Sequence, residues 1–165
     1  MPIIAALLFV ALLIASNAFI VETTGILPER VASHFGGNNL PNGWMSRSGY
    51  LAFMLSFAGL LPVVVTAVVG GLPRLFPGAI NIPHREYWLA PTRRDTTIGF
   101  LAAHACWLGS MLTVFVAGIH YLLLQAHMSA PPRLPVELFW TMLATFLGAI
   151  GVWIGTLVMR FRTTG

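Results

Sequence analysis

The chain contains no lysine, and only 8% of its 165 residues are charged. A soluble domain carries about 25% charged residues. Cys106 is the only cysteine, so neither an intramolecular disulfide nor a cysteine-based metal site can form. These shortages exclude an ordinary water-soluble domain and a fold held together by disulfides.

Long apolar stretches take the place of the missing charge. Hydrophobic residues make up 57% of the chain, and the mean hydropathy is +0.82. The apolar stretches cover residues 3–21, 50–72, 97–124 and 138–159. Each reaches the length of about 20 residues that a helix needs to cross a bilayer. The sequence therefore predicts an all-α fold: one integral membrane domain, residues 1–165, built as a four-helix bundle with a structured extracytoplasmic loop and an Arg-rich cytoplasmic loop.

The arginines predict the orientation of this bundle. The side of the membrane with both termini and the second loop holds Arg74, Arg85, Arg93, Arg94, Arg160 and Arg162. The opposite side holds Arg30, Arg47 and Arg133. The positive-inside rule places the more basic side, with both termini, in the cytoplasm. A basic surface there favours anionic lipid headgroups as partners, and no recognition module accompanies it that would indicate nucleic acid.

The first span also offers a signal-cleavage alternative. Ser16-Asn17-Ala18 places small residues where a signal peptidase would cut. No basic residue precedes the apolar run, however, so we expect the span to be retained.

The first loop, residues 22–49, is too long for a simple connection. Pro28 suits the first turn of a short helix over residues 29–34, which the run at 36–39 would end, and residues 41–43 read as a turn. We expect aromatic residues of the loop to lie on the membrane surface. The candidate residues for binding a partner or ligand are Pro28, Glu29, Arg30, His34, Phe35, Trp44 and Arg47.

This loop resembles the domain of unknown function that opens the SdpI-type membrane proteins of bacteria. The resemblance covers about residues 20–70, and it rests on Pro28, Arg30-Val31, His34-Phe35, Pro41-Asn42-Gly43, Trp44 and Ser46-Arg47. Ala32 replaces a proline that the family often has, and Arg47 replaces its usual lysine. The resemblance implies a multi-pass protein of the bacterial inner membrane with a role in immunity or signalling. The chain lacks the additional spans expected of a full immunity protein.

The second loop is predicted to form a cytoplasmic docking surface. Its prolines forbid a long helix and favour extended or turning segments. Thr92 is expected to cap the third long helix, with Asp95 in its first turn. The candidate docking residues are Asn81, Arg85, Glu86, Trp88, Arg93 and Arg94.

Two histidines lie within the third span. His104 and His120 are 16 residues apart, which is about 24 Å along a helix and 160° around it, so they cannot share a metal. The other spans contain no histidine to supply the second axial ligand of a haem, and no cofactor is expected. His120 is the intramembrane polar candidate, because such groups are costly and usually have a partner. We expect a neutral histidine hydrogen-bonded to a neighbour.

Small residues predict where the helices pack. In the fourth span Ala144, Gly148, Gly151 and Gly155 recur on one face and include a GxxxG step. The second and third spans carry comparable stripes. These stripes favour packing within the bundle, and an oligomer interface on the fourth helix is the alternative.

Three functions remain open. We favour a non-catalytic binding or signalling module, or an accessory subunit, that forms a homo-oligomer or joins a larger membrane complex. The alternative is a metal or enzymatic site at the outer surface using His34 and His120, with Glu22, Glu29 or His127; two histidines and a carboxylate would suit zinc. Transport is the third, and little in the spans supports it.

Overall fold

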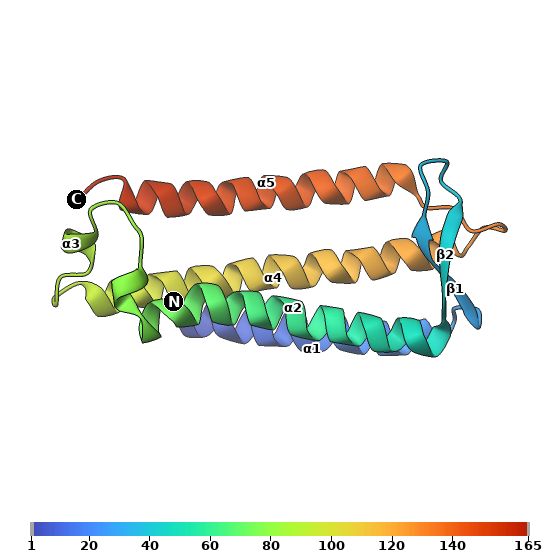
Figure 1. The fold of residues 1–165 in the computed structure, drawn as a ribbon, viewed down its shortest axis with the longest axis horizontal. Coiled ribbons are helices and arrows are strands. Elements are labelled where there is room, and N and C mark those ends of the chain that lie inside the picture. Colours follow the sequence, from blue (N-terminus) through green and yellow to red (C-terminus); the bar gives the residue numbers. More distant parts are fainter. Residues whose placement is uncertain (1, 165) are drawn as a thin grey trace.

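The computed structural model describes residues 2–164 and contains four long helices (Figure 1). They are α1 (Pro2–Thr24), α2 (Arg47–Leu75), α4 (Arg94–Ala126) and α5 (Val136–Phe161). All four are long and apolar enough to cross a membrane. Each contains one of the predicted spans and extends it by one to three residues at either end. The chain is thus an all-α, multi-pass membrane protein, as predicted.

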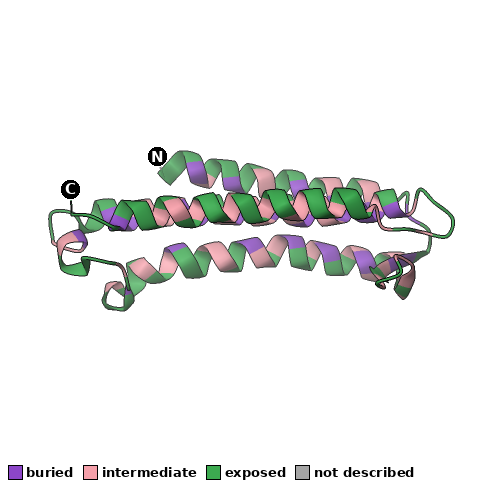
Figure 2. Ribbon diagram, turned by 90° about the horizontal axis from the view of Figure 1, so that it is seen from above, coloured by how far each residue is buried: buried purple, intermediate pink, exposed green. Residues whose placement is uncertain are grey.

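The core lies among α1, α2 and α4. Ile20 of α1, Tyr50 and Met54 of α2, and Val116 of α4 are buried together there. Many large apolar side chains are exposed instead, and exposed positions, drawn in green, recur along the helices in Figure 2. An apolar exterior is the arrangement expected when hydrocarbon rather than water is the solvent.

Small residues bring α2 and α4 close together. A Cβ atom added to Gly70 would lie 2.8 Å from the Cβ of Ala105, and one added to Gly109 would meet Thr66 and Phe9. Thr66 Oγ1 also donates a hydrogen bond to the Ala105 carbonyl, at 3.5 Å. The small-residue stripes predicted for the second and third spans are confirmed at these positions.

The stripe predicted for the fourth span does not pack within the bundle. Around Gly148, Gly151 and Gly155, no heavy atom of the described chain lies within 4 Å of a Cβ built there. Larger residues hold α5 against α4 instead: the ring of Phe146 stacks on that of Phe115 at 4.3 Å. Because these long side chains bridge the two helices, the glycine face is turned away from α4.

The first loop forms a β-hairpin, so the prediction of a short helix over residues 29–34 is wrong. Strand β1 (Arg30–Phe35) pairs antiparallel with β2 (Pro41–Ser46). The turn lies before residue 41 rather than at 41–43, where Asn39 takes a φ of 62° and the Gly36 N–H bonds the Leu40 carbonyl at 2.8 Å. Asparagine tolerates this left-handed conformation, which reverses the chain.

The second loop contains two short helical turns, η1 (Pro77–Ala79) and α3 (Arg85–Trp88). The expectation that Thr92 caps the next helix is wrong, since α4 begins after Arg93, without a side-chain cap. The backbone N–H groups of Arg93 and Arg94 both bond the Ala90 carbonyl at 2.9 Å. A backbone turn therefore leads into α4, and Asp95 lies in its first turn as predicted.

Candidate functional site

The hairpin is attached to the connection between α4 and α5. The Ala32 N–H donates to Nε2 of His127 at 3.0 Å, and the Asn39 side chain donates to the Leu134 carbonyl at 2.9 Å. His127 Nδ1 lies 2.8 Å from the Leu123 carbonyl. Because a carbonyl only accepts, His127 carries its proton on Nδ1 and is free to accept on Nε2. This neutral histidine joins the hairpin to α4.

Arg47 stabilises the other side of the hairpin. Its Nη1 donates to the carbonyls of Gly25 and Leu27 at 3.2 and 3.0 Å, and its backbone N–H bonds the Glu29 carbonyl. These bonds satisfy carbonyls just beyond the end of α1. Arg47 was predicted to bind a partner. In the structure its guanidinium binds backbone carbonyls of the same chain.

One face of the hairpin remains open. Trp44 is 46% exposed, and the Arg30 guanidinium lies 6.0 Å from the centre of its ring. Pro28, Glu29 and His34 are also exposed, whereas Phe35 is half-buried. Five of the seven predicted binding residues are therefore exposed, either on the hairpin or directly before its first strand.

A buried polar triad lies below the hairpin and links three helices. His120 of α4 is fully buried; its Nδ1 lies 2.7 Å from the Tyr50 hydroxyl, and its Nε2 lies 2.8 Å from Oγ1 of Thr23. The Thr23 hydroxyl donates to the Phe19 carbonyl at 2.6 Å. Thr23 must then accept from Nε2–H, and on a neutral ring Nδ1 accepts from the Tyr50 hydroxyl. Both ring nitrogens of His120 therefore have a hydrogen-bond partner.

Sequence reasoning missed the partners of His120. Neither Tyr50 nor Thr23 was among the residues selected from the sequence. Both lie at span ends on the same side of the membrane as His120. Their shared depth in the membrane is the feature of the sequence that could have indicated these contacts.

The predicted pairing of His34 with His120 is not formed. Both ring nitrogens of His120 have other partners, and His34 lies on the hairpin with its Nδ1 3.2 Å from the Ser33 hydroxyl. Within residues 2–164, no group of three His, Cys, Asp or Glu side chains could hold a metal ion. The geometry therefore gives no support to the alternative of an outer metal site.

Trp88 of the second loop packs against the ends of α4 and α5. It is 8% exposed, its carbonyl accepts from the Thr97 hydroxyl at 2.8 Å, and its ring meets that of Phe161 edge-on at 5.4 Å. The Arg160 guanidinium lies 4.7 Å above the same ring. Trp88 was predicted as a docking residue, but its buried position removes it from that surface.

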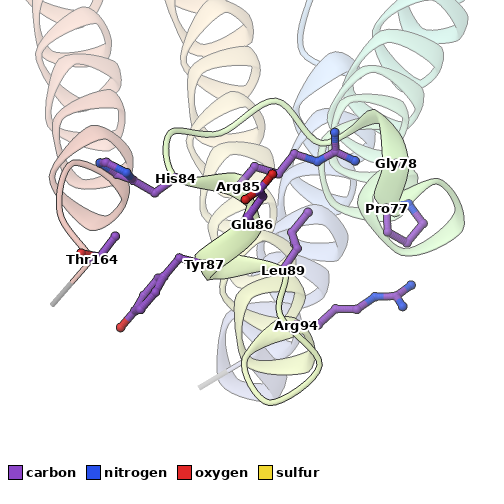
Figure 3. A pocket seen from close by; sticks show the side chains of 9 residues that line it. All are labelled: Pro77, Gly78, His84, Arg85, Glu86, Tyr87, Leu89, Arg94 and Thr164. Atoms are coloured by element: carbon purple, nitrogen blue, oxygen red, sulfur yellow. The ribbon is translucent and has the colours of Figure 1, made fainter.

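Three of the five remaining docking residues, Arg85, Glu86 and Arg94, line an open hollow of about 1050 Å³ (Figure 3). It is lined by Pro77, Gly78, His84, Arg85, Glu86, Tyr87, Leu89, Arg94 and Thr164. Figure 3 shows Arg85 extending towards Gly78 while Arg94 points away from Tyr87. Asn81 and Arg93 are exposed nearby, and the Arg93 guanidinium lies 4.0 Å above the Tyr87 ring. The basic side chains are spread around the hollow rather than aimed at one point.

Comparison with known proteins gives one finding. A family model described as "Domain of unknown function (DUF1648)" matches residues 3–60. The matched segment contains α1 from its second residue onward, the whole hairpin and the first half of α2, so it includes Thr23 and Tyr50 but not His120. No curated protein and no solved structure matches the chain.

Proposed function

We propose that this protein is a non-catalytic membrane module whose outer hairpin binds a partner protein or peptide. The observation that carries the proposal is the contrast between the fixed frame of the hairpin and its open face. His127 and Arg47 hold the frame by hydrogen bonds to backbone atoms, while Trp44 and Arg30 lie exposed beside each other.

Physical reasoning favours this surface for recognition. Tryptophan and arginine are enriched among the residues that dominate binding energy at protein interfaces. A surface that is already ordered loses little conformational entropy when a partner binds. The exposed pair on the hairpin satisfies both conditions.

The proposal extends to orientation and biological role. The hairpin faces the outside of a bacterial inner membrane, and both termini and the Arg-rich loop lie in the cytoplasm. There the loop meets anionic lipid headgroups or docks a second subunit, which makes the chain part of a homo-oligomer or of a larger complex. The resemblance of the hairpin segment to the SdpI-type proteins supports a role in immunity or signalling, and the family model that matches this segment describes a domain of unknown function.

Photo-crosslinking in native membranes tests the proposal. A photoreactive phenylalanine in place of Trp44 should capture a discrete partner, and the same residue in place of Trp140 should not. Trp140 is a suitable control because it is 59% exposed on α5, at the end nearer the hairpin. The captured species is identified by mass spectrometry.

Two further substitutions sharpen the result. Arg30→Gln should lower the co-purification of that partner, whereas Arg133→Gln, an exposed arginine of the next outer loop, should leave it unchanged. Equal crosslinking from Trp44 and Trp140, or recovery of the chain alone, would contradict a binding role for the hairpin.

A further inference from the structure

A groove at the inner end of the bundle lies outside the proposed function. It is a hollow of about 880 Å³ between the start of α1, the first half of α4 and the end of α5. Its lining is Pro2, Ile4, Ala5, Asp95, Thr96, Gly99, Phe100, Ala103, His104, Trp107 and Arg160. Figure 1 shows α5 set to one side, next to α4. The groove is the space that this arrangement leaves between α5 and α1.

The wall between α4 and α5 is held by a reciprocal pair of hydrogen bonds. Nε2 of His104 donates to the Trp153 carbonyl at 2.9 Å, and Nε1 of Trp153 donates to the His104 carbonyl at 2.9 Å. The two rings stack with their centres 4.7 Å apart. This pair fixes the separation of the helices, so the groove is a built feature of the bundle.

The groove has the length of one lipid leaflet. From Asp95 to Trp107 the helix rises about 18 Å, at 1.5 Å per residue, and half of the hydrocarbon core is about 15 Å thick. The lining is mainly apolar along this length. Trp107 also lines a deeper apolar hollow of about 460 Å³ that contains Leu8 and Leu12. An acyl chain could therefore follow α4 from the membrane surface to the bilayer centre.

The mouth of the groove is basic. The exposed Arg160 guanidinium lies 4.7 Å above the Trp88 ring and 5.6 Å from the Phe100 ring, which holds the cation at the groove entrance. An adjoining hollow, which shares Asp95 and Gly99 with the groove, contains Arg74 and Arg94. Three arginines against the Asp95 carboxylate give this end a net positive charge.

We propose that the groove binds a phospholipid with an anionic headgroup from the leaflet on the Arg-rich side, with the phosphate beside Arg160 and one acyl chain along Ala103 and Trp107. Charge at one end and apolar lining along the rest match the two parts of such a lipid. A second copy in the same orientation would bring the same net positive charge to that depth, whereas a lipid phosphate complements the arginines at the mouth.

Native mass spectrometry of the full chain, released from nanodiscs of phosphatidylglycerol or of phosphatidylcholine with the same acyl chains, tests this site. The wild type should retain one phosphatidylglycerol and about fivefold less phosphatidylcholine, the effect of about one basic residue near an anionic lipid. Arg160→Gln should remove that preference. Arg162→Gln, an exposed arginine two residues further along, should preserve it.

A second variant tests the acyl part without touching charge. A Cβ on Gly99 would meet no described atom within 4 Å, so Gly99→Leu places its side chain in the groove without a backbone clash. It should abolish retention of both lipids. Gly71→Leu, with equally open space on α2, should change nothing.

Three outcomes would overturn the site. They are equal retention of the two lipids by the wild type, retention of lipid by Gly99→Leu, and a dimer that Gly99→Leu dissociates. The last would show that a second copy occupies the groove.

Discussion

His120 shows how a single polar residue is accommodated within the membrane. Both of its ring nitrogens form hydrogen bonds with side chains of other helices. The Thr23 hydroxyl in turn donates to the Phe19 carbonyl. Phe19 also presents its ring edge to His120 at a centre distance of 5.3 Å. The triad thus ties α1, α2 and α4 together at the end of the bundle that carries the hairpin.

Tyr50→Phe should destabilise the protein by about 1 kcal/mol, since it leaves a buried acceptor on His120 without a donor. Tyr121→Phe is the matched control, because Tyr121 is 46% exposed on the same helix as His120. The measurement is the free energy of unfolding in a detergent titration. Equal values for the two variants would show that the Tyr50 hydroxyl contributes no stability through His120.

Among the elements of the fold, the hairpin is held in position by a few hydrogen bonds to residues outside its strands. An isolated two-stranded hairpin is marginally stable in water. Here Val31 and Ala32 are fully buried, and His127 accepts the Ala32 N–H. The surrounding bundle therefore decides whether the strands are held in one place.

His127→Leu should increase the mobility of the hairpin, because it leaves the Ala32 N–H without its acceptor. A spin label on Gly37→Cys, at the exposed turn, in a Cys106→Ala background reports this as a sharper electron paramagnetic resonance spectrum. His84→Leu, at an exposed position of the inner loop, serves as the control. An unchanged spectrum in the His127 variant would mean that other contacts suffice to hold the hairpin.

The packing of α2 on α4 gives another test at this scale. Gly70→Leu should destabilise the bundle by about 1–3 kcal/mol, since its Cβ would already lie 2.8 Å from that of Ala105. Gly71→Leu, the adjacent position, meets no described atom within 4 Å and should be nearly neutral. Detergent unfolding compares the two, and similar losses would mean that α2 does not approach α4 at Gly70.

For the whole molecule, the testable property is its orientation. A membrane-impermeant maleimide added to intact cells should label Gly37→Cys on the hairpin and not Asn81→Cys on the inner loop, both in a Cys106→Ala background. Disrupting the cells should make Asn81→Cys reactive. Labelling of both positions in intact cells would contradict opposite sides for the two loops, and the reverse pattern would invert the proposed topology.

Several parts of the candidate sites could be predicted from sequence. Arg30, His34 and Trp44 were selected as binding candidates, and they are exposed in the structure, because charged and aromatic residues in a loop rich in turn-forming residues rarely lie in a core. Arg47 and Trp88 were selected for the same reason, yet each makes contacts within the chain. Residue type alone does not distinguish a side chain that is free to bind another molecule from one that already makes contacts within its own chain.

Local hydropathy indicates that this chain is a membrane protein and where its four spans lie, because hydrocarbon as a solvent acts on every stretch of about 20 residues locally. Three other features could not be derived from hydropathy. They are the hairpin in the first loop, the contacts of His120 with Thr23 and Tyr50, and the orientation of the glycine face of α5 away from α4. Each depends on contacts between residues far apart in the chain, and local hydropathy and spacing carry no record of which distant side chains meet.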